Sequence, residues 1–313
     1  MKNNIYLGID TSNYTTSAAL YGGVCFNGKK LLPVAGGQIG LRQSDAVFHH
    51  TKQLPSLVKE AFERLDGGKI AAVGVSNAPR EAEGSYMPCF LVGLSAATML
   101  SAALNVPLFT FSHQQGHIAA ALYSAGRLDL LDRDFIAFHL SGGTTEALLV
   151  KGDGVPHGTQ IAGSLDLKAG QAVDRVGVML GLPFPAGRQL DGLARRCEKT
   201  FKIRPCLKGA DISLSGIQNK CEKMLHDGAP KEDIAAFCVE SIAVSVEACA
   251  QKLLESHGNL PLVFSGGVSS NSTLRERLKF GAIFAEPEFS ADNAFGAAVL
   301  AASIHGSRSG DQG

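Results

Sequence analysis

The sequence predicts an α/β protein built from two lobes of like topology. Strand-like and helix-like segments alternate along the 313 residues, which is typical of α/β folds with largely parallel sheets. In addition, a strand–turn–strand pattern occurs twice, over residues 5–21 and again over 135–150. Each copy has an apolar strand, a turn rich in Thr, Ser or Gly, and a second apolar strand, and this weak internal repeat indicates two related lobes.

The composition is that of a globular protein, with 45% hydrophobic and 19% charged residues. The formal net charge is zero, so there is no global attraction to nucleic acid or to an anionic membrane, and an RNA-binding role would need a local basic patch or a partner. The seven cysteines form no C-x-x-C pair, and the first residues run into a strand rather than a secretory signal. We therefore expect a cytoplasmic protein whose thiols stay reduced.

The first lobe is expected over residues 1–130, with residues 294–313 packing back on it. Its expected elements are, in order, strands at 5–9 and 17–21, a helix at 54–65, a strand at 70–75, a helix at 89–104, a strand at 106–111 and a helix with His113 and His117. Residues 84–111 carry no charge and are long enough to cross a bilayer, but Pro88, Asn105 and Pro107 interrupt them. A buried helix followed by a strand is therefore predicted, and no membrane association.

The second lobe is expected over residues 131–293. Its predicted elements, together with the last helix of the chain, are strands at 135–140 and 146–150, helices at 166–180 and 234–256, a strand at 260–265, and helices at 272–279 and 294–304. The small polar residues 306–313 are expected to fray.

His113 and His117 are the first candidate functional residues. Their i, i+4 spacing places both imidazoles on one face of a helix, one turn apart, which is the spacing that a metal ion takes from two histidines on one helix. The alternative is a pair of histidines at the end of a helix that bond to backbone carbonyls. Two ligands do not complete a metal site, so at least one more has to come from elsewhere in the chain.

Three turns rich in Gly, Ser or Thr follow predicted strands, at residues 10–16, 141–145 and 265–271. Ligands of open α/β sheets lie where the chain leaves the carboxyl ends of strands, and backbone N–H groups in such turns bind anions. We therefore predict phosphate sites here, with Asp10, Thr11 and Ser12 as the first candidate loop; the alternative is that each segment is only a tight turn. The sequence has neither a G-x-x-x-x-G-K-[ST] nor a G-x-G-x-x-G motif, so those two nucleotide folds are not supported.

Eight short motifs occur in an order that resembles a known family. They are Gly8-Ile9-Asp10-Thr11-Ser12, His113-x-x-Gly116-His117, Ser141-Gly142-Gly143, Gly170-x-Ala172-x-Asp174, Pro185-x-Gly187, Ser213-x-Ser215-Gly216, Gly266-Gly267-Val268-x-x-Asn271 and Asp292-Asn293. Together they resemble the TsaD/Kae/Gcp family of tRNA threonylcarbamoyl-adenosine transferases, formerly described as O-sialoglycoprotein endopeptidases. The resemblance extends from residue 5 to about residue 301.

The resemblance implies an actin-like ATPase fold (sugar kinase/Hsp70/actin) with two lobes and a central cleft between them. It implies that Asp292 joins His113 and His117 as the third ligand of one divalent metal ion, for which Zn, Fe and Mg are not distinguished; from the residues alone, Asp292 is equally an N-cap carboxylate. It further assigns ten residues to substrate and nucleotide binding: His139, Leu140, Ser141, Gly142, Gly143, Asp174, Gly187, Gly266, Gly267 and Asn271. From the residues alone, Asp174 is also explained as a helix-surface carboxylate paired with Arg175 or Lys168.

The implied reaction moves a threonylcarbamoyl group from threonylcarbamoyl-AMP to an adenosine in the tRNA anticodon loop. The expected ligands are a divalent metal and ATP, ADP or an adenylate; the expected partners are tRNA, subunits of a threonylcarbamoylation complex, and a second copy in a homo-oligomer. Backbone N–H groups of 141–143 would stabilise developing negative charge. The tract from Arg188 to Lys208 is the most basic part of the chain and predicts phosphate contact, although a solvated helix face explains it as well.

Four departures from the family motifs lie near the chemistry. Tyr14-Thr15-Thr16 stands where the family has Asp-Glu-Thr, and Ala78-Pro79-Arg80 where it has Gly-Pro-Gly. Thr144 replaces the histidine of Ser-Gly-Gly-His-Thr, and Gln115 replaces the glutamate of His-x-Glu-Gly-His. The metal and nucleotide residues are retained, so we interpret the chain as a divergent paralogue.

Other functions use the same fold or the same histidines. A small-molecule kinase or ATPase would use Asp10 with Mg²⁺, and a regulatory paralogue would bind nucleotide without catalysis. A metalloprotease of the H-E-x-x-H type needs a glutamate directly after the first histidine, where Gln114 stands, so that activity is disfavoured.

Overall fold

A computed structural model describes residues 4–12, 14–33, 41–278, 281–290 and 292–310 of the chain. It divides into two compact units, one made of residues 1–133, 151–157 and 291–313, the other of residues 134–150 and 158–290. Residues 131–133, 151–157 and 291–293, which were expected in the second lobe, thus fall in the first of these units. Within residues 151–157, the backbone N–H of Gly154 donates to the carbonyl of Leu131, 3.0 Å away.

A five-stranded sheet forms the centre of the first unit. Its order is β3-β2-β1-β4-β5, and the strands are β1 (Ile5–Asp10), β2 (Thr15–Gly22), β3 (Phe26–Leu31), β4 (Ile70–Ala78) and β5 (Leu108–Ser112). β1 is antiparallel to β2 but parallel to β4, and β4 is parallel to β5. The carboxyl ends of β1, β4 and β5 therefore meet at one edge of the sheet, which brings Asp10 close to the residue that follows Ser112.

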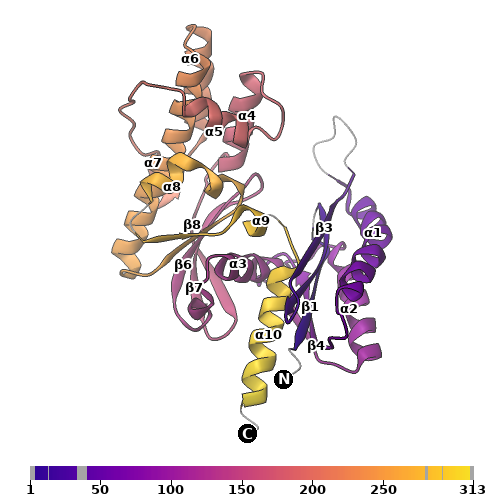
Figure 1. Ribbon diagram of the computed structural model, residues 1–313. Coiled ribbons are helices and arrows are strands. Elements are labelled where there is room, and N and C mark those ends of the chain that lie inside the picture. The colour runs from indigo at the N-terminus through magenta and orange to yellow at the C-terminus, as the bar shows by residue number, and fades with distance from the viewer. Residues whose placement is uncertain (1–3, 13, 34–40, 279–280, 291, 311–313) are drawn as a thin grey trace. The chain divides into compact units, whose positions relative to one another are not determined.

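Helices cover both faces of this sheet, with α1 and α2 on one side and α10 on the other (Figure 1). The helices of the unit are α1 (Gln43–Glu63), α2 (Phe90–Leu104), α3 (His113–Ser124), the 3₁₀ turn η1 (Leu128–Asp132) and α10 (Phe295–Gly310). A Cβ on Gly8 of β1 would overlap the carbonyl oxygen of Ala294, and one on Gly74 of β4 that of Ala297. Glycines on the two central strands thus let α10 lie directly against the sheet.

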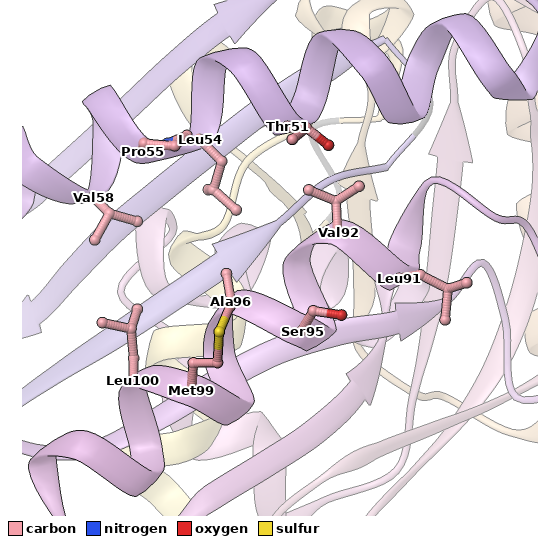
Figure 2. A pocket seen from close by; sticks show the side chains of 10 residues that line it. All are labelled: Thr51, Leu54, Pro55, Val58, Leu91, Val92, Ser95, Ala96, Met99 and Leu100. Atoms are coloured by element: carbon pink, nitrogen blue, oxygen red, sulfur yellow. The ribbon is translucent and has the colours of Figure 1, made fainter.

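An apolar groove of about 560 Å³ lies between α1 and α2 (Figure 2). Its lining residues are mainly aliphatic: Thr51, Leu54, Pro55, Val58, Leu91, Val92, Ser95, Ala96, Met99 and Leu100. None of them is a predicted site residue, so the groove is separate from the predicted chemistry. Among the described residues, no helix is both long and apolar enough to span a bilayer.

The second unit repeats the strand order of the first. Its sheet has the order β12-β11-β6-β7-β8, from β6 (Phe135–Leu140), β7 (Thr145–Gly152), β8 (Pro156–Gly163), β11 (Leu262–Ser265) and β12 (Ala282–Phe284). β6 is antiparallel to β7 and parallel to β11, as β1 is to β2 and β4. The internal repeat predicted from the two strand–turn–strand segments is therefore confirmed.

The helices of the second unit are grouped around the long helix α7, which contacts α4, α5, α6 and α8. They are α4 (Ala169–Met179), α5 (Gly187–Ala194), α6 (Ser215–His226), α7 (Lys231–His257), η2 (Gly267–Ser270), α8 (Ser272–Arg277) and α9 (Pro287–Ser290); the short strands β9 (Leu207–Lys208) and β10 (Asp211–Ile212) form a separate ribbon. The predicted helix 272–279 ends earlier, and Lys279 lies outside the described residues.

Several elements differ from the prediction. α1 begins at Gln43 and contains Pro55, whereas the predicted helix began at residue 54. Its first turns are mostly polar, so a pattern of apolar residues does not reveal them. They are held by a hydrogen bond between the buried side chains of His50 and Thr16, with Nδ1 and Oγ1 2.8 Å apart. β3, β8, α5 and α6 were not predicted, and β3 (FNGKKL) has only one fully buried residue, Phe26.

Candidate metal centre and nucleotide site

His113 is the first residue of α3 and directly follows β5. Ser112 fixes this junction with a capping box: its Oγ accepts from the Gln115 N–H at 3.2 Å, and the Gln115 side chain accepts from the Ser112 N–H at 2.8 Å. Gln115, where the family has glutamate, therefore completes the capping box of α3. The cap sets the first turn of α3 at the carboxyl edge of the sheet, and His117 follows one turn later on the same face.

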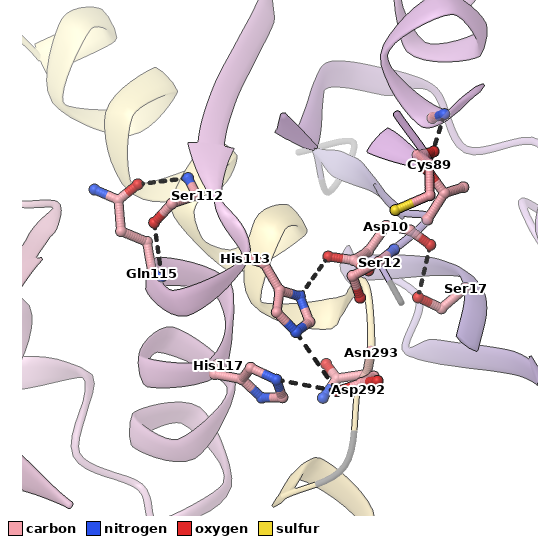
Figure 3. A network of polar contacts seen from close by, with 12 residues as sticks. Asp10, Ser12, Ser17, Cys89, Ser112, His113, Gln115, His117, Asp292 and Asn293 are labelled. Carbon is pink, nitrogen blue, oxygen red and sulfur yellow. Dashed lines mark hydrogen bonds and ion pairs between the residues drawn. The ribbon is translucent and has the colours of Figure 1, made fainter. Parts of the chain in front are cut away.

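Asp292 meets both histidines (Figure 3). Its Oδ1 lies 3.5 Å from Nε2 of His113 and 3.2 Å from Nε2 of His117. The segment that carries Asp292 leads into α10, which packs against α3. The three residues predicted as metal ligands therefore converge within the first unit, although Asp292 is remote from the histidines in sequence.

The donor set fits a divalent metal ion. One ligand atom from each of His113, His117 and Asp292 lies within 4.8 Å of the other two. Ligands about 2.1 Å from a tetrahedral ion are roughly 3.4 Å apart, close to the two distances from Asp292 Oδ1. Two imidazoles and one carboxylate suit Zn²⁺ or Fe²⁺ better than Mg²⁺, which prefers an all-oxygen shell.

Opposite charges at the site shift the pKa values of His113 and Asp292. Burial alone would lower the pKa of His113, but the carboxylates of Asp10 and Asp292 outweigh it and raise the pKa to about 10. Burial raises the pKa of Asp292, yet hydrogen bonds from both histidines bring it well below its usual range. A metal ion would compete with the proton on His113, because imidazole binds metals only in its neutral form.

The predicted phosphate loop at Asp10, Thr11 and Ser12 is buried, and these residues are at most 1% exposed. Asp10 Oδ2 lies 2.8 Å from Nδ1 of His113, and Oδ1 accepts from the Ser12 N–H at 2.9 Å. Thr11 Oγ1 donates to the Cys89 carbonyl and accepts from the Gly93 N–H, which joins β1 to α2. These contacts lie inside the first unit and give the phosphate loop no support, so it stays a prediction; Asn13, in the same turn, lies outside the described residues.

In the second unit, residues 141–144 form a tight turn between β6 and β7. The Ser141 N–H donates to the Thr144 carbonyl at 2.7 Å, and the Thr144 N–H donates to Ser141 Oγ at 3.0 Å. The start of α4 can lie against this turn because residue 170 is glycine; a Cβ at this position would overlap the backbone of Gly142. Gly142 and Gly143 themselves are exposed, with nothing within 4 Å of a Cβ added at either.

The segment after β11 lies beside this turn, because β6 and β11 are parallel neighbours with Ser265 opposite His139. Ser265 Oγ is 3.1 Å from Nδ1 of His139. Gly266 has φ +90°, and a Cβ there would overlap the Leu140 carbonyl, so the position requires glycine. The predicted residues at 139–143 and at Gly266 and Gly267 therefore share one edge of the second sheet.

Asn271 and Gly187 lie at helix starts, and Asp174, in the middle of α4, contacts the start of α5. Asn271 caps α8 by accepting from the Leu274 N–H, and its amide donates to Asp191 of α5 at 2.8 Å. Asp174 accepts from the Ala186 N–H at 2.8 Å, one residue before α5 begins at Gly187. Asp174 therefore bonds to a backbone N–H group and not to Arg175 or Lys168, the partners considered from the sequence. No sequence pattern indicated that Asp191 would bond to Asn271.

The basic tract is partly neutralised. Arg195 pairs with Asp191 at 3.0 Å, Arg196 with Glu232 at 3.8 Å and Lys199 with Asp233 at 3.5 Å. The three basic side chains are more than 60% exposed, so the pairs are weak. Contact between the tract and an RNA backbone stays a prediction.

The fold and the two-histidine, one-aspartate cluster define the class: an α/β protein with an actin-like fold and a candidate metal centre in its first unit. Thermococcus kodakarensis HypF shares the fold, with a TM-score of 0.62 and 13% identity over 99% of this chain and 48% of that one. The ROK hexokinase of Thermus thermophilus covers 99% of this chain and 100% of its own, with a TM-score of 0.53 and 15% identity.

The sequence comparisons identify the family. The family model for TsaD, tRNA N6-adenosine threonylcarbamoyltransferase, matches residues 37–299. The tRNA N6-adenosine threonylcarbamoyltransferase of Carboxydothermus hydrogenoformans is 32% identical, with 96% of this chain and 92% of that protein covered. The chain therefore belongs to the TsaD family of transferases, as its motifs indicated.

Proposed function

We propose that this protein is a metal-dependent acyltransferase that moves a threonylcarbamoyl group from threonylcarbamoyl-AMP to adenosine in the tRNA anticodon loop. Family membership gives the reaction class. The observation that carries the proposal is the convergence of His113, His117 and Asp292 within 4.8 Å of one another.

His113, His117 and Asp292 would hold the divalent ion. When bound, the ion supplies Lewis acidity toward an oxygen of the acyl donor. The capping box at Ser112 and the packing of α10 against α3 position the three residues before an ion binds. The first unit would thus contribute all three ligands, the two histidines from α3 and Asp292 from the segment that leads into α10.

Residues 141–143, 266–267 and Asn271 would bind the adenylate. Gly142 and Gly143 lie exposed in a turn against the start of α4, where backbone N–H groups and the helix dipole favour an anion. Asp174 and Asn271 support this surface by fixing the starts of α5 and α8. His139 and Leu140 would orient the same ligand from the end of β6. Gly187 would contact it from the start of α5.

In the reaction, the exocyclic amine of adenosine attacks the carbamoyl carbon, loses a proton, and AMP leaves. Backbone N–H groups in the 141–143 turn would stabilise the developing negative charge. Tyr14 and Thr15 stand where the family has its two acids; Tyr14 is half-buried and Thr15 is buried. The turn thus offers neither of the family's two acids to this step, which supports a rate or an acceptor preference that differs from the family's.

Two other functions receive less support. A kinase of the same fold would direct Asp10 at Mg²⁺, but both carboxylate oxygens of Asp10 already have protein partners. A metalloprotease lacks its glutamate, because Gln114 follows His113. Partner subunits and tRNA remain part of the proposal.

Complementation tests the proposal. In a strain depleted of its own transferase, the wild-type gene should restore threonylcarbamoyladenosine in tRNA, and His113→Ala should not. His226→Ala, on α6, is the matched control because this side chain is 90% exposed. If the wild type fails to modify tRNA with its partners present while it still binds ATP, the transferase proposal is wrong.

A further inference from the structure

The carboxyl group of Asp10 is buried next to the candidate metal centre (Figure 3). It is 1% exposed and stands at the end of β1. Oδ2 lies 2.8 Å from His113 Nδ1, and Oδ1 accepts from the Ser12 backbone N–H at 2.9 Å. The Ser76 side chain of β4 also hydrogen-bonds to this carboxyl group. Asp10 is thus fixed from three sides and has little freedom to move.

The bond to Asp10 determines which nitrogen of His113 faces the other ligands. A neutral imidazole carries one proton, and a proton on Nδ1 leaves the lone pair on Nε2. Nε2 of His113 is the atom that lies 3.5 Å from Asp292 Oδ1, and His117 also presents Nε2 to that oxygen. The orientation required for shared coordination is therefore the one that an acceptor at Nδ1 selects.

We propose that Asp10 is a positioning residue for the metal centre, which holds His113 as its Nδ1–H tautomer with Nε2 directed at the ion. This inference rests on the proposed metal site and assigns Asp10 no direct ligand or phosphate contact. Carboxylate–histidine–metal arrangements of this kind fix the ring and raise the basicity of the ligand nitrogen.

Asp10→Asn is the informative variant, because it keeps the size of the side chain and replaces one acceptor oxygen by an NH₂ donor. The Ser12 backbone N–H can only donate a hydrogen bond, so the side-chain oxygen of the new asparagine should remain its acceptor. The NH₂ group then faces Nδ1 of His113, which has to become the acceptor. The proton moves to Nε2, the nitrogen that should bind metal, and zinc affinity should fall about 10- to 100-fold.

Ser17→Ala is the matched control. Ser17 is also buried and donates to the backbone carbonyl of Asp10 at 3.2 Å, so its removal takes away a bond to the same residue and leaves the carboxylate contacts intact. This variant should bind zinc with wild-type affinity.

The experiment uses the full chain with Zn²⁺ as the probe. Zinc affinity is measured by competition with a chelating dye, and two-bond ¹H–¹⁵N spectra of histidine-labelled protein report which nitrogen of His113 carries the proton. Zinc-loaded wild type should show His113 protonated on Nδ1 and bound through Nε2. This spectrum needs no variant, so it remains decisive if Asp10→Asn does not fold.

The outcomes separate the two proposals. A wild-type protein that binds no zinc at the three ligands overturns the metal site itself. A wild type that binds zinc through Nδ1 of His113, or a folded Asp10→Asn with unchanged affinity and Nδ1–H tautomer, overturns the role of Asp10 and leaves the metal site standing.

Discussion

Asp166 joins two segments of the second unit through a single carboxylate. Its oxygens accept from the Ser213 and Ser215 hydroxyls at 2.8 and 2.6 Å, and from the backbone N–H of Leu214 at 2.7 Å. Although burial raises its pKa, these bonds outweigh that effect and leave the pKa of Asp166 well below its usual range. The residue thus ties the segment before α4 to the start of α6.

Asp166→Asn should lower the melting temperature at pH 7. A depressed carboxyl pKa contributes stability that is fully present above the unfolded pKa of about 3.9 and is lost as the pH falls toward the folded value. The difference between wild type and variant should therefore shrink below about pH 4. Thermal unfolding of both proteins from pH 7 to pH 3 measures this, with exposed Asp227→Asn as the control; a difference independent of pH would contradict the assignment.

His117→Ala should abolish stabilisation by zinc. A ligand at 100 times its Kd stabilises the folded state by about 2.7 kcal/mol, so the wild type should melt several degrees higher with excess Zn²⁺. Ser124→Ala, at the far end of α3, should respond like the wild type because Ser124 is not one of the proposed ligands; its hydroxyl donates to the Ala121 carbonyl at 3.0 Å. An equal zinc response in the His117 variant would exclude this residue as a ligand.

At the scale of elements, the packing of α10 against α3 places Asp292 next to the two histidines. A Cβ at Gly296 would overlap the carbonyl oxygen of Gly116, so the two helices cross at backbone contact. The crossing explains why a residue before α10 reaches two histidines on α3. Its geometry depends on the absence of a side chain at residue 296.

Gly296→Ala should destabilise the protein by about 3 kcal/mol, because the overlap involves backbone and cannot be relieved by a side-chain rotation. Gly306→Ala in the same helix is the matched control. It has open space at the Cβ position, and alanine should there stabilise the helix by about 0.5–1 kcal/mol. Chemical denaturation of both variants provides the comparison; similar free energies of unfolding would show that the crossing is looser than described.

The elements themselves were largely predictable, because apolar period and turn residues are local signals. β1, α2 and β6 were expected close to their observed bounds, and a helix that carries His113 and His117 was expected where α3 lies. β3 and the first turns of α1 were not, since their stability comes from contacts such as His50 with Thr16 and not from a pattern. The pairing of His113 with His117 follows from helical spacing alone, but Asp292 was found only through the family motif. Asp10 was expected at a phosphate. Its contact with His113 was not predicted, because that contact depends on the placement of β4 between β1 and β5.

At the scale of the whole molecule, the chain uses one strand order twice, with different chemical groups at the carboxyl edge of each sheet. The first unit presents imidazole and carboxylate groups at the carboxyl edge of its sheet, and the second presents glycine-rich turns at the equivalent edge. Zn²⁺ should therefore slow amide exchange in α3 and in residues 292–295, while ATP should slow it at 141–143 and 266–271. Hydrogen exchange with each ligand alone distinguishes the two; protection of both sets by either ligand would contradict separate sites.

The most direct test of the central claim is transfer of a labelled threonylcarbamoyl group from threonylcarbamoyl-AMP to tRNA by the metal-loaded protein together with the proposed partner subunits. We predict that label appears on the anticodon-loop adenosine with the wild type, and that His113→Ala and Asp292→Ala lose at least about 100-fold in rate, as expected when an ion's stabilisation of the transition state is removed. Equal transfer by the wild type and both variants, or no transfer by a wild type that holds metal and nucleotide, would contradict the account.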